Sequence, residues 1–356
     1  MIARLLTFHV ARSLLVWIGL TCLLLLAVYT LIELIREARS LTGDYGALEM
    51  VWYLVQTTPR RLYDIFPFAA LIGTLLGLGA LANANELVAM RVAGFDRGRL
   101  MTRVLLTVMV CLLLVMWMAE WLIPELEARA RAERQQARTG QLHFGGAGQF
   151  WLRDGSYMIR LGAAVWVDQQ RLVFTDVLVY QLDSSMRPQS IVTAEQGLHT
   201  GTEWQLEQVS WRDLDNGELG RQQTVNLVSG LTPGLFQAAV SRPRLLALWD
   251  LYRMRSYLER SGLDTTPYDQ AFWARIFFPL NVIAMVLIAL PFVFRTVRSG
   301  NQGAGLFIGV ALGLMFFVAS RLMAGMALVW PLPLWLSSML PALLIIALST
   351  FLMRRV

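Results

Sequence analysis

SLLVWIGLTCLLLLAVYTLI (Ser13–Ile32) runs for 20 residues without a charged side chain. A helix that crosses the hydrocarbon core of a bilayer needs about 20 predominantly apolar residues, so this stretch predicts a membrane span. The rest of the 356-residue chain has the same character: 56% of residues are hydrophobic and only 16% are charged, and the mean hydropathy is +0.51. Soluble domains carry about 25% charged residues. The composition therefore predicts an integral membrane protein.

Five further apolar stretches are long enough to cross a membrane. They are Ile65–Asn85, Val104–Ala119 with its extension Trp121–Pro124, Ile276–Phe294, and residues 302–329 and 334–353. The last two are halves of one run that the turn-forming WPLP (Trp330–Pro333) divides. The predicted fold class is an α-helical membrane protein with six transmembrane helices, arranged three plus three around an inserted β-jellyroll-like domain.

The insert between the third and fourth spans is polar and reads as β structure. Of the 25 acidic residues, 18 lie between Glu120 and Asp269, and 17 of these are in the insert. Short runs rich in Val, Ile, Trp and Tyr alternate there with turn residues, and the runs are Phe150–Val165, Arg171–Gln181, Gln189–Leu198 and Glu203–Trp211. Seven or more strands at this spacing predict a sandwich or jelly roll. The predicted divisions are 1–124, 125–270 and 271–356, with an amphipathic helix at Leu245–Ser261 leading back to the membrane.

Arginine counts predict the orientation of the spans. With the N-terminus in the cytoplasm, the cytoplasmic segments hold ten arginines, and the short segment on the opposite side holds four. Positively charged residues concentrate on the cytoplasmic side of membrane proteins. Both termini are therefore expected in the cytoplasm, with the insert on the other side.

Enzyme classes find little support in the sequence. All 31 basic residues are Arg, so the chain lacks the lysine that a Walker A nucleotide site requires. The three histidines, His9, His143 and His199, show no metal-ligand spacing. No catalytic residue and no metal ligand is predicted.

The segment ANELVAMRVAGFDRGR (Ala84–Arg99) joins the second and third spans on the expected cytoplasmic side. Glu86 would lie in the first turn of a short helix, where the helix dipole favours negative charge. Val88, Val92 and Phe95 would share one face. Two interpretations stay open here. The segment is either a coupling helix that docks into a cytoplasmic partner or an amphipathic loop helix on lipid headgroups.

A second set of candidates is cationic. Arg131, Arg134 and Arg138 fall on one face of a helix that continues the third span. They form either a stripe that holds lipid phosphates or a solvated face with Glu127–Arg131 and Arg129–Glu133 pairs at i, i+4. Arg60 and Arg61, just before the second span, invite the same two interpretations, and Arg321 either snorkels outward or faces a polar cavity.

Three motifs resemble the lipopolysaccharide export permease family, LptF/LptG. FPFAALIGTLLGLGALANANELVAMRVAGF (Phe66–Phe95) resembles its second span and coupling segment, and SYLERSGLDTTPY (Ser256–Tyr268) and WARIFFPLNVIAMVLIALPFVF (Trp273–Phe294) extend the match. The first two motifs are more similar to the LptG branch than to the LptF branch.

The resemblance implies a permease subunit of an ABC transporter in the inner membrane of a Gram-negative bacterium. Such a subunit extracts lipopolysaccharide and passes it to a periplasmic bridge towards the outer membrane. The implied partners are an LptF-like paralogue, an LptB-like ATPase dimer that binds ATP and Mg, and LptC-like and LptA-like bridge proteins. No cofactor is expected in this chain. The alternative is a non-transporting membrane scaffold or regulator of ABC type that signals to a periplasmic partner.

The resemblance also implies roles for particular residues. Glu86, with Met90 and Phe95, would engage the ATPase, and Arg60, Arg131 and Arg134 would contact lipid phosphates. Family members can carry a substrate-facing lysine in the first span, and the nearest positions here are Ile32 and Glu33. Arg36, one turn later, is the expected substitute.

Overall fold

The computed structural model describes residues 2–39, 45–92, 94, 96–139, 150–154, 156–162, 164–168, 171–183, 187–199, 203–228, 243–299, 302–330 and 333–355. The chain folds into two compact units. The first, which we call the helical unit, comprises Met1–Arg39, Leu54–Ile123 and Asp269–Val356. The second, the insert unit, comprises Ser40–Tyr53 and Pro124–Tyr268.

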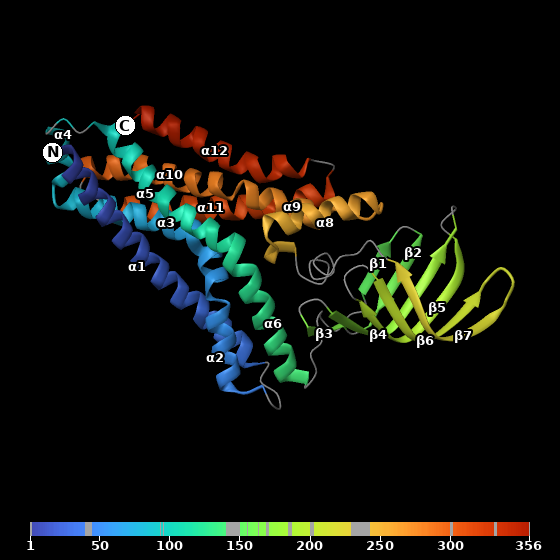
Figure 1. The fold of residues 1–356 in the computed structure, drawn as a ribbon. Helices are drawn as coiled ribbons and strands as arrows, with labels where there is room; N and C mark the ends of the chain where they lie inside the picture. Colours follow the sequence, from blue (N-terminus) through green and yellow to red (C-terminus); the bar gives the residue numbers. More distant parts are fainter. Residues whose placement is uncertain are drawn as a thin grey trace. The chain divides into compact units, whose positions relative to one another are not determined.

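The helical unit is a bundle of long apolar helices (Figure 1). In chain order the helices are α1 (Ile2–Ala38), α3 (Thr58–Asn83), α4 (Glu86–Val92), α5 (Arg97–Trp117), a π-helical turn η1 (Met118–Leu122), α9 (Thr266–Ile276), α10 (Phe278–Ser299), α11 (Gln302–Val329) and α12 (Leu334–Arg355). Five of the described helical segments are long and apolar enough to cross a membrane, and the bent pair α9–α10 makes a sixth. The six predicted spans are confirmed.

The fourth span is broken where α9 meets α10. The two helices meet at an angle of 47°, and Pro279 lies just inside α10. A proline ring clashes with the carbonyl group four residues earlier and offers it no N–H, and that carbonyl belongs to Arg275 at the end of α9. The proline therefore accounts for the bend.

Helix α3 lies at the centre of the bundle and packs against α1, α10 and α11. A Cβ atom on Gly73 would lie 2.5 Å from the Cα of Ile18 in α1, so only glycine allows this approach of the two backbones. On α11, Gly309 and Gly313 receive the side chains of Leu75 and Leu71. These three glycines therefore lie on helix-packing faces of the bundle.

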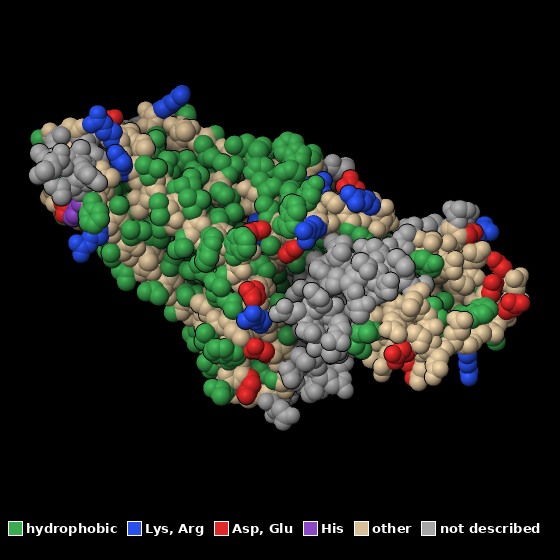
Figure 2. Space-filling model, viewed as in Figure 1, with side chains coloured by type: hydrophobic (Ala, Val, Ile, Leu, Met, Phe, Trp, Pro, Cys, Tyr) green, Lys and Arg blue, Asp and Glu red, His purple; other side chains and the backbone are tan. Residues whose placement is uncertain are grey.

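The outer surface of the bundle is apolar. Hydrophobic side chains cover the visible face of the helices (Figure 2), and Leu23, Leu24 and Leu113 are more than half exposed. A water-facing surface does not carry a contiguous apolar face of this kind. The surface therefore fits a lipid environment.

The insert unit contains one antiparallel sheet of seven described strands. The strands are β1 (Phe150–Asp154), β2 (Tyr157–Leu161), β3 (Ala164–Asp168), β4 (Arg171–Leu182), β5 (Pro188–His199), β6 (Glu203–Asp213) and β7 (Leu219–Val228). Their order is β1-β2-β4-β5-β6-β7, with β3 beside β2 along the same edge of β4. This confirms the β character and strand number of the insert. Apart from the pairing of β2 with β4, neighbours in the sheet follow one another along the chain.

One face of the sheet is apolar and carries a small core. Phe174 stacks on Trp204 with ring centroids 4.8 Å apart, and Leu161 and Leu206 are fully buried beside them. The insert unit also holds α6 (Ile123–Thr139), most of α2 (Ala47–Gln56), a 3₁₀ turn (Pro243–Leu245) and α8 (Leu248–Arg260). Helix α8 confirms the helix expected at Leu245–Ser261, apart from its first turn.

A line of residues across the sheet interrupts the strand alternation. On β4, Thr175 and Asp176 are both exposed, and on β6, Glu207 and Gln208 are both exposed. Asp176 and Gln208 have positive φ angles of 55° and 54°. The alternation of buried and exposed residues therefore shifts by one position here. On β4 the buried residues are Phe174 before the two exposed positions and Val177 after them.

Candidate coupling and lipid-contact sites

Helix α4 forms in the short segment between α3 and α5. Asn85, with a φ of 58°, turns the chain after α3, and its carbonyl accepts the N–H of Ala89. Glu86 lies in the first turn of α4, as expected. The helix is shorter than the predicted 84–99, because the Asp96 side chain accepts the Gly98 N–H and begins α5 instead.

The two faces of α4 differ in polarity and burial. Leu87 and Met90 are buried in the core of the helical unit, whereas Val88 and Val92 are exposed, Val92 to 86%. The exposed pair leaves an apolar surface on this face of α4. Met90 anchors the helix, so any effect of Met90 on coupling would pass through the seating of α4. Phe95 lies outside the described residues.

Glu86 has a neighbour that the sequence did not indicate. The Nε2 of His9, near the start of α1, lies 2.7 Å from Oε2 of Glu86. The Glu86 side chain nevertheless stays 39% exposed. The carboxylate thus contacts α1 and is still partly accessible.

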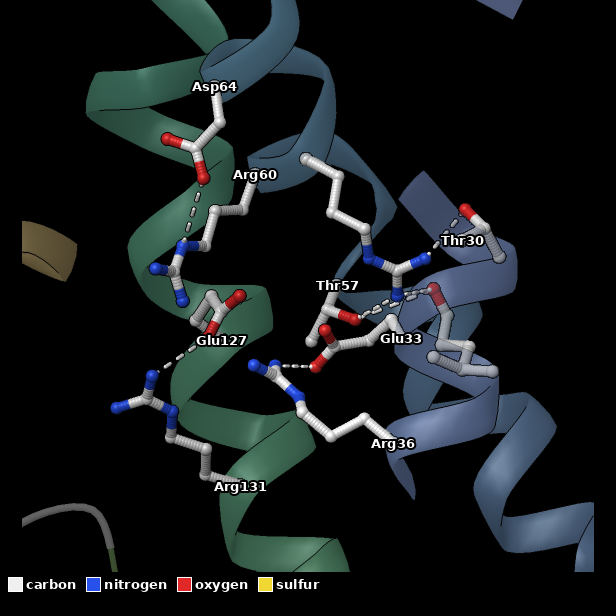
Figure 3. Close-up of polar contacts among 10 residues, drawn as sticks. Thr30, Glu33, Arg36, Thr57, Arg60, Asp64, Glu127 and Arg131 are labelled. Carbon is white, nitrogen blue, oxygen red and sulfur yellow. Dashed lines mark hydrogen bonds and ion pairs between the residues drawn. The ribbon is translucent and has the colours of Figure 1, made fainter. Parts of the chain in front are cut away.

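Two of the predicted lipid-contact arginines belong to the helical unit. Arg36 forms an ion pair with Glu33 one turn earlier on α1, and Nε of Arg60 lies 3.8 Å from Asp64 on α3 (Figure 3). Both guanidinium groups keep exposed surface, Arg36 more than Arg60. The acidic neighbours orient these side chains without enclosing them.

The other two belong to α6 in the insert unit. Arg131 pairs with Glu127 at 3.3 Å (Figure 3), and the Glu127 side chain is only 3% exposed. The guanidinium of Arg134 lies over the ring of Tyr53, 5.3 Å from its centroid. Of the expected i, i+4 pairs, Glu127–Arg131 is confirmed and Arg129–Glu133 is wrong. Arg129 pairs with Glu125, because Glu133 accepts the indole N–H of Trp52.

Arg61 differs sharply from Arg60, although the sequence suggested the same two roles for both. Its side chain is buried and donates to Thr30 of α1, to Thr57 and to the carbonyl of Leu54. Arg61 therefore joins α1 to the start of α3. Neighbouring residues of a helix point in different directions, so Arg61 is buried while Arg60 stays partly exposed. Their adjacent positions in the sequence do not show which of the two is buried.

Arg321 lies at the surface of the helical unit. It is exposed on α11, and its guanidinium lies over the ring of Phe317 at 5.5 Å. The ring provides a cation–π contact for the guanidinium group, and both interpretations of Arg321 stay predictions.

Arg275 was not predicted as a functional residue. It is 8% exposed, donates a hydrogen bond to the carbonyl of Ala119 and lies 3.9 Å from Glu120. In the sequence it only marks the edge of an apolar run. The nearby prolines, Pro124 and Pro279, were the available signal, because a proline leaves a carbonyl group in need of another donor.

Among the described residues, no group of three or more His, Cys, Asp and Glu side chains could hold a metal ion. The site chemistry lies in partly exposed arginines and in one carboxylate on a short helix between two spans. Together with the apolar bundle and its inserted sheet, these features define a multi-pass membrane protein with a polar β insert.

Comparison with known proteins narrows this class. The family model for the lipopolysaccharide export system permease LptF/LptG matches residues 9–355, and the chain belongs to this family. The chain is similar to the lipopolysaccharide export system permease protein LptG of Haemophilus influenzae, with 30% identity over 355 residues, 98% of this chain and 97% of that protein. It is equally similar to LptG of Escherichia coli K12, with 30% identity over 353 residues, 98% of this chain and 97% of the relative.

Proposed function

We propose that this chain is a permease subunit that exports lipopolysaccharide, taking the lipid from the inner membrane and passing it to a periplasmic bridge. The observation that carries the proposal is the match to LptG relatives over nearly the full length of both chains. The six spans and the inserted sheet supply the two parts such a subunit needs: a membrane body and a lipid-accepting domain outside it.

The proposal implies two partners for the ATP-driven part of the transport cycle. ATP and Mg bind to a separate LptB-like ATPase dimer, since this chain contains no lysine for a Walker A site. Glu86 on α4 engages a basic residue of that ATPase, with Val88 and Val92 making apolar contacts beside it. A second permease, LptF-like, completes the membrane part.

The insert provides the route out of the membrane. The outer strands of its sheet, β1 and β7, end the strand order, and an open strand edge can pair with a strand of another protein. We infer that LptC-like and LptA-like bridge proteins continue the sheet from one of these edges. Lipid then passes between similar β domains.

The orientation follows from the arginine distribution and the helix order. Both chain ends and α4 lie at the same end of the helical unit (Figure 1), which fits an even number of spans. The positive-inside rule puts that end in the cytoplasm. The insert then extends into the periplasm.

Four arginines are proposed to contact lipid phosphates: Arg36, Arg60, Arg131 and Arg134. Each has a carboxylate or an aromatic ring beside it that limits its rotamers. Guanidinium groups bind phosphate through charge-assisted and often bidentate hydrogen bonds. Limited side-chain freedom reduces the entropy lost on binding.

The test is reconstitution of the chain with its paralogue and ATPase in proteoliposomes that contain lipopolysaccharide. ATP should drive transfer of the lipid to a soluble bridge protein, and a non-hydrolysable ATP analogue should not. ATP hydrolysis in the assembled complex without any transfer would contradict export and favour the scaffold alternative.

A further inference from the structure

The Arg275 guanidinium bonds to a backbone carbonyl group that a proline in the third span leaves without a donor. In η1 the N–H of Ile123 bonds to the carbonyl of Met118, five residues earlier. The carbonyl of Ala119 would be served by Ile123 in an α-helix or by residue 124 in a π-helix. Residue 124 is Pro, which has no N–H. Neither helix pattern therefore supplies Ala119 with a donor, and the Arg275 guanidinium does.

Arg275 itself stands at the break in the fourth span. It lies in the last turn of α9, four residues before Pro279, where α9 and α10 bend by 47°. Its charge is buried, with Glu120 3.9 Å away. A buried guanidinium among apolar spans is costly unless hydrogen-bonded and paired, and such residues are a marker of function.

A third helix meets the same side chain. The ring of Tyr63, on α3, has its centroid 6.0 Å from the Arg275 guanidinium carbon. Tyr63 also stacks on Phe278 at the start of α10, with centroids 4.1 Å apart. We call Tyr63, Ala119, Glu120, Arg275 and Phe278 the proline junction, because it joins the two breaks that proline makes.

The proline junction lies far from α4 along both helices that flank it. Tyr63 is 20 residues before the end of α3, and Ala119 is 22 residues after the start of α5. At 1.5 Å per residue, each separation is about 30 Å, the thickness of a bilayer core. The junction therefore ties together the remote ends of the two spans attached to α4.

We propose that Arg275 is a positioning residue for transport. It joins spans two and three to the α9–α10 elbow, so that a movement of α4 reaches the elbow on the other side of the membrane. This inference rests on the proposed function, in which α4 receives the ATP-driven movement.

The test measures lipid transferred per ATP hydrolysed in the reconstituted complex. R275A should lower this ratio by about fivefold or more, within the range of single-residue effects on coupling between sites, while ATPase co-purification stays near wild type. R275K should give an intermediate ratio, since ammonium can donate to one carbonyl group but lacks the planar fork. A wild-type ratio in R275A would overturn the proposal.

Arg61 provides the matched control, because it is also a buried, multiply bonded arginine in the helical unit but lies outside the proline junction. R61A should lower the melting temperature of the complex and leave the transfer ratio of the assembled fraction near wild type. An equal loss of the ratio in R61A would show that any missing buried arginine has this effect, and the proposal would fail.

A compensating variant separates positioning from simple carbonyl capping. P124A supplies the missing N–H, so Ala119 gains a backbone donor whether the turn becomes α-helical or stays π-helical. In the R275A background, P124A should restore the melting temperature and leave the transfer ratio low. Recovery of both would mean that Arg275 only caps the carbonyl. If R275A does not fold, the double variant and R275K carry the same comparison.

The proposed function and this inference fail in different ways. A wild-type complex that hydrolyses ATP without moving lipid refutes the proposed function. The melting temperatures of R275A and R275A/P124A are measured without a transport assay, so they do not depend on the proposed function. If P124A gives R275A no thermal rescue, the hydrogen-bond argument behind the proline junction is wrong.

Discussion

His9 on α1 and Glu86 on α4 are held together by a 2.7 Å contact between Nε2 and Oε2. The pair is exposed on both sides, and exposed pairs contribute about 0–1 kcal/mol to stability. Its consequence is therefore geometric: the start of the first span and the helix between the second and third spans share one contact. Because Glu86 contacts His9, substitutions at both positions can show whether the Glu86 carboxylate acts in the fold or in binding a partner.

Glu86→Lys should insert and fold but lose ATPase binding. A carboxylate in a desolvated charge pair across an interface is worth on the order of 2–5 kcal/mol when truncated. Glu86→Gln should show the same loss, more weakly, although its amide can still bond to His9. His9→Gln is the matched control and should keep assembly near wild type. Co-purification of the ATPase provides the measurement, and equal losses in His9→Gln and Glu86→Gln would assign Glu86 to the fold.

Lipid binding should depend on Arg131 and Arg134 but not on Arg129, which lies on the same helix and pairs with Glu125. Removing Arg131 alone would deprive the buried Glu127 of its 3.3 Å partner, so Glu127→Gln should accompany Arg131→Ala to keep the fold. A hydrogen bond to a charged group is worth about 1.5–3 kcal/mol, or roughly tenfold or more in affinity. Photocrosslinking to lipopolysaccharide from α6 measures the effect. Equal crosslinking in the triple variant with Arg134→Ala would remove α6 from the lipid path.

Two glycines on α3 should respond oppositely to alanine. At Gly73 a Cβ would lie 2.5 Å from the Ile18 Cα, whereas at Gly79 the described residues leave the position open. Gly73→Ala should destabilise the bundle by about 1–3 kcal/mol, as overpacking does. Gly79→Ala should be neutral or stabilising by up to about 1 kcal/mol from helix propensity. Thermal unfolding in detergent compares the two variants. Similar melting temperatures would mean that α1 and α3 do not approach each other closely at Gly73.

The sequence predicted the parts of the fold that depend on composition and periodicity. Apolar length located six spans, and alternation with turn residues located the strands. The junctions depend on particular partners. Arg275 looked like the edge of a span because its acceptor, the Ala119 carbonyl, lies 156 residues away, and its need for a donor arises from a proline in another helix.

The candidate site divides in the same way. Local sequence was enough to place Glu86 in the first turn of α4, because helix starts favour acidic residues, whereas its coupling role came from the family resemblance. His9 is 77 residues from Glu86 in the chain, and no local pattern pairs them. Arg60 and Arg61 are neighbours in sequence, yet only the packing of α1 against α3 shows that Arg61 is enclosed and Arg60 is not.

The start of α9 should respond to acid through Asp264. Hydrogen bonds from the Thr266 hydroxyl and then from its backbone N–H lower the pKa of this carboxyl group below its usual value. A carboxyl group with a lowered folded-state pKa stabilises the fold above the unfolded-state pKa of about 3.9. That stabilisation is lost as the pH falls through the folded-state pKa. Because Asp264 is exposed, the effect should be small. Asp264→Asn should lessen the fall in melting temperature as the pH drops below about 4, and a parallel decline in both proteins would contradict this assignment.

Two residues with strained backbone, Asp176 on β4 and Gln208 on β6, lie in the sheet. Gln208 on β6 has a φ of 54°, a left-handed conformation that costs a non-glycine residue about 1–2 kcal/mol. Glycine has no such penalty. Gln208→Gly should therefore stabilise the sheet by up to about 1 kcal/mol, because the relieved strain exceeds the extra chain entropy that glycine loses on folding. Gln205 lies on the same strand, is exposed and has no positive φ, so Gln205→Gly should destabilise the sheet by about 0.5–1 kcal/mol. Hydrogen exchange of peptides from Glu203–Asp213 in the full-length protein reports both changes locally. Slower exchange in Gln208→Gly with faster exchange in Gln205→Gly is the expected result. Faster exchange in both would mean that the bend at Gln208 is held by its side chain and not tolerated as strain.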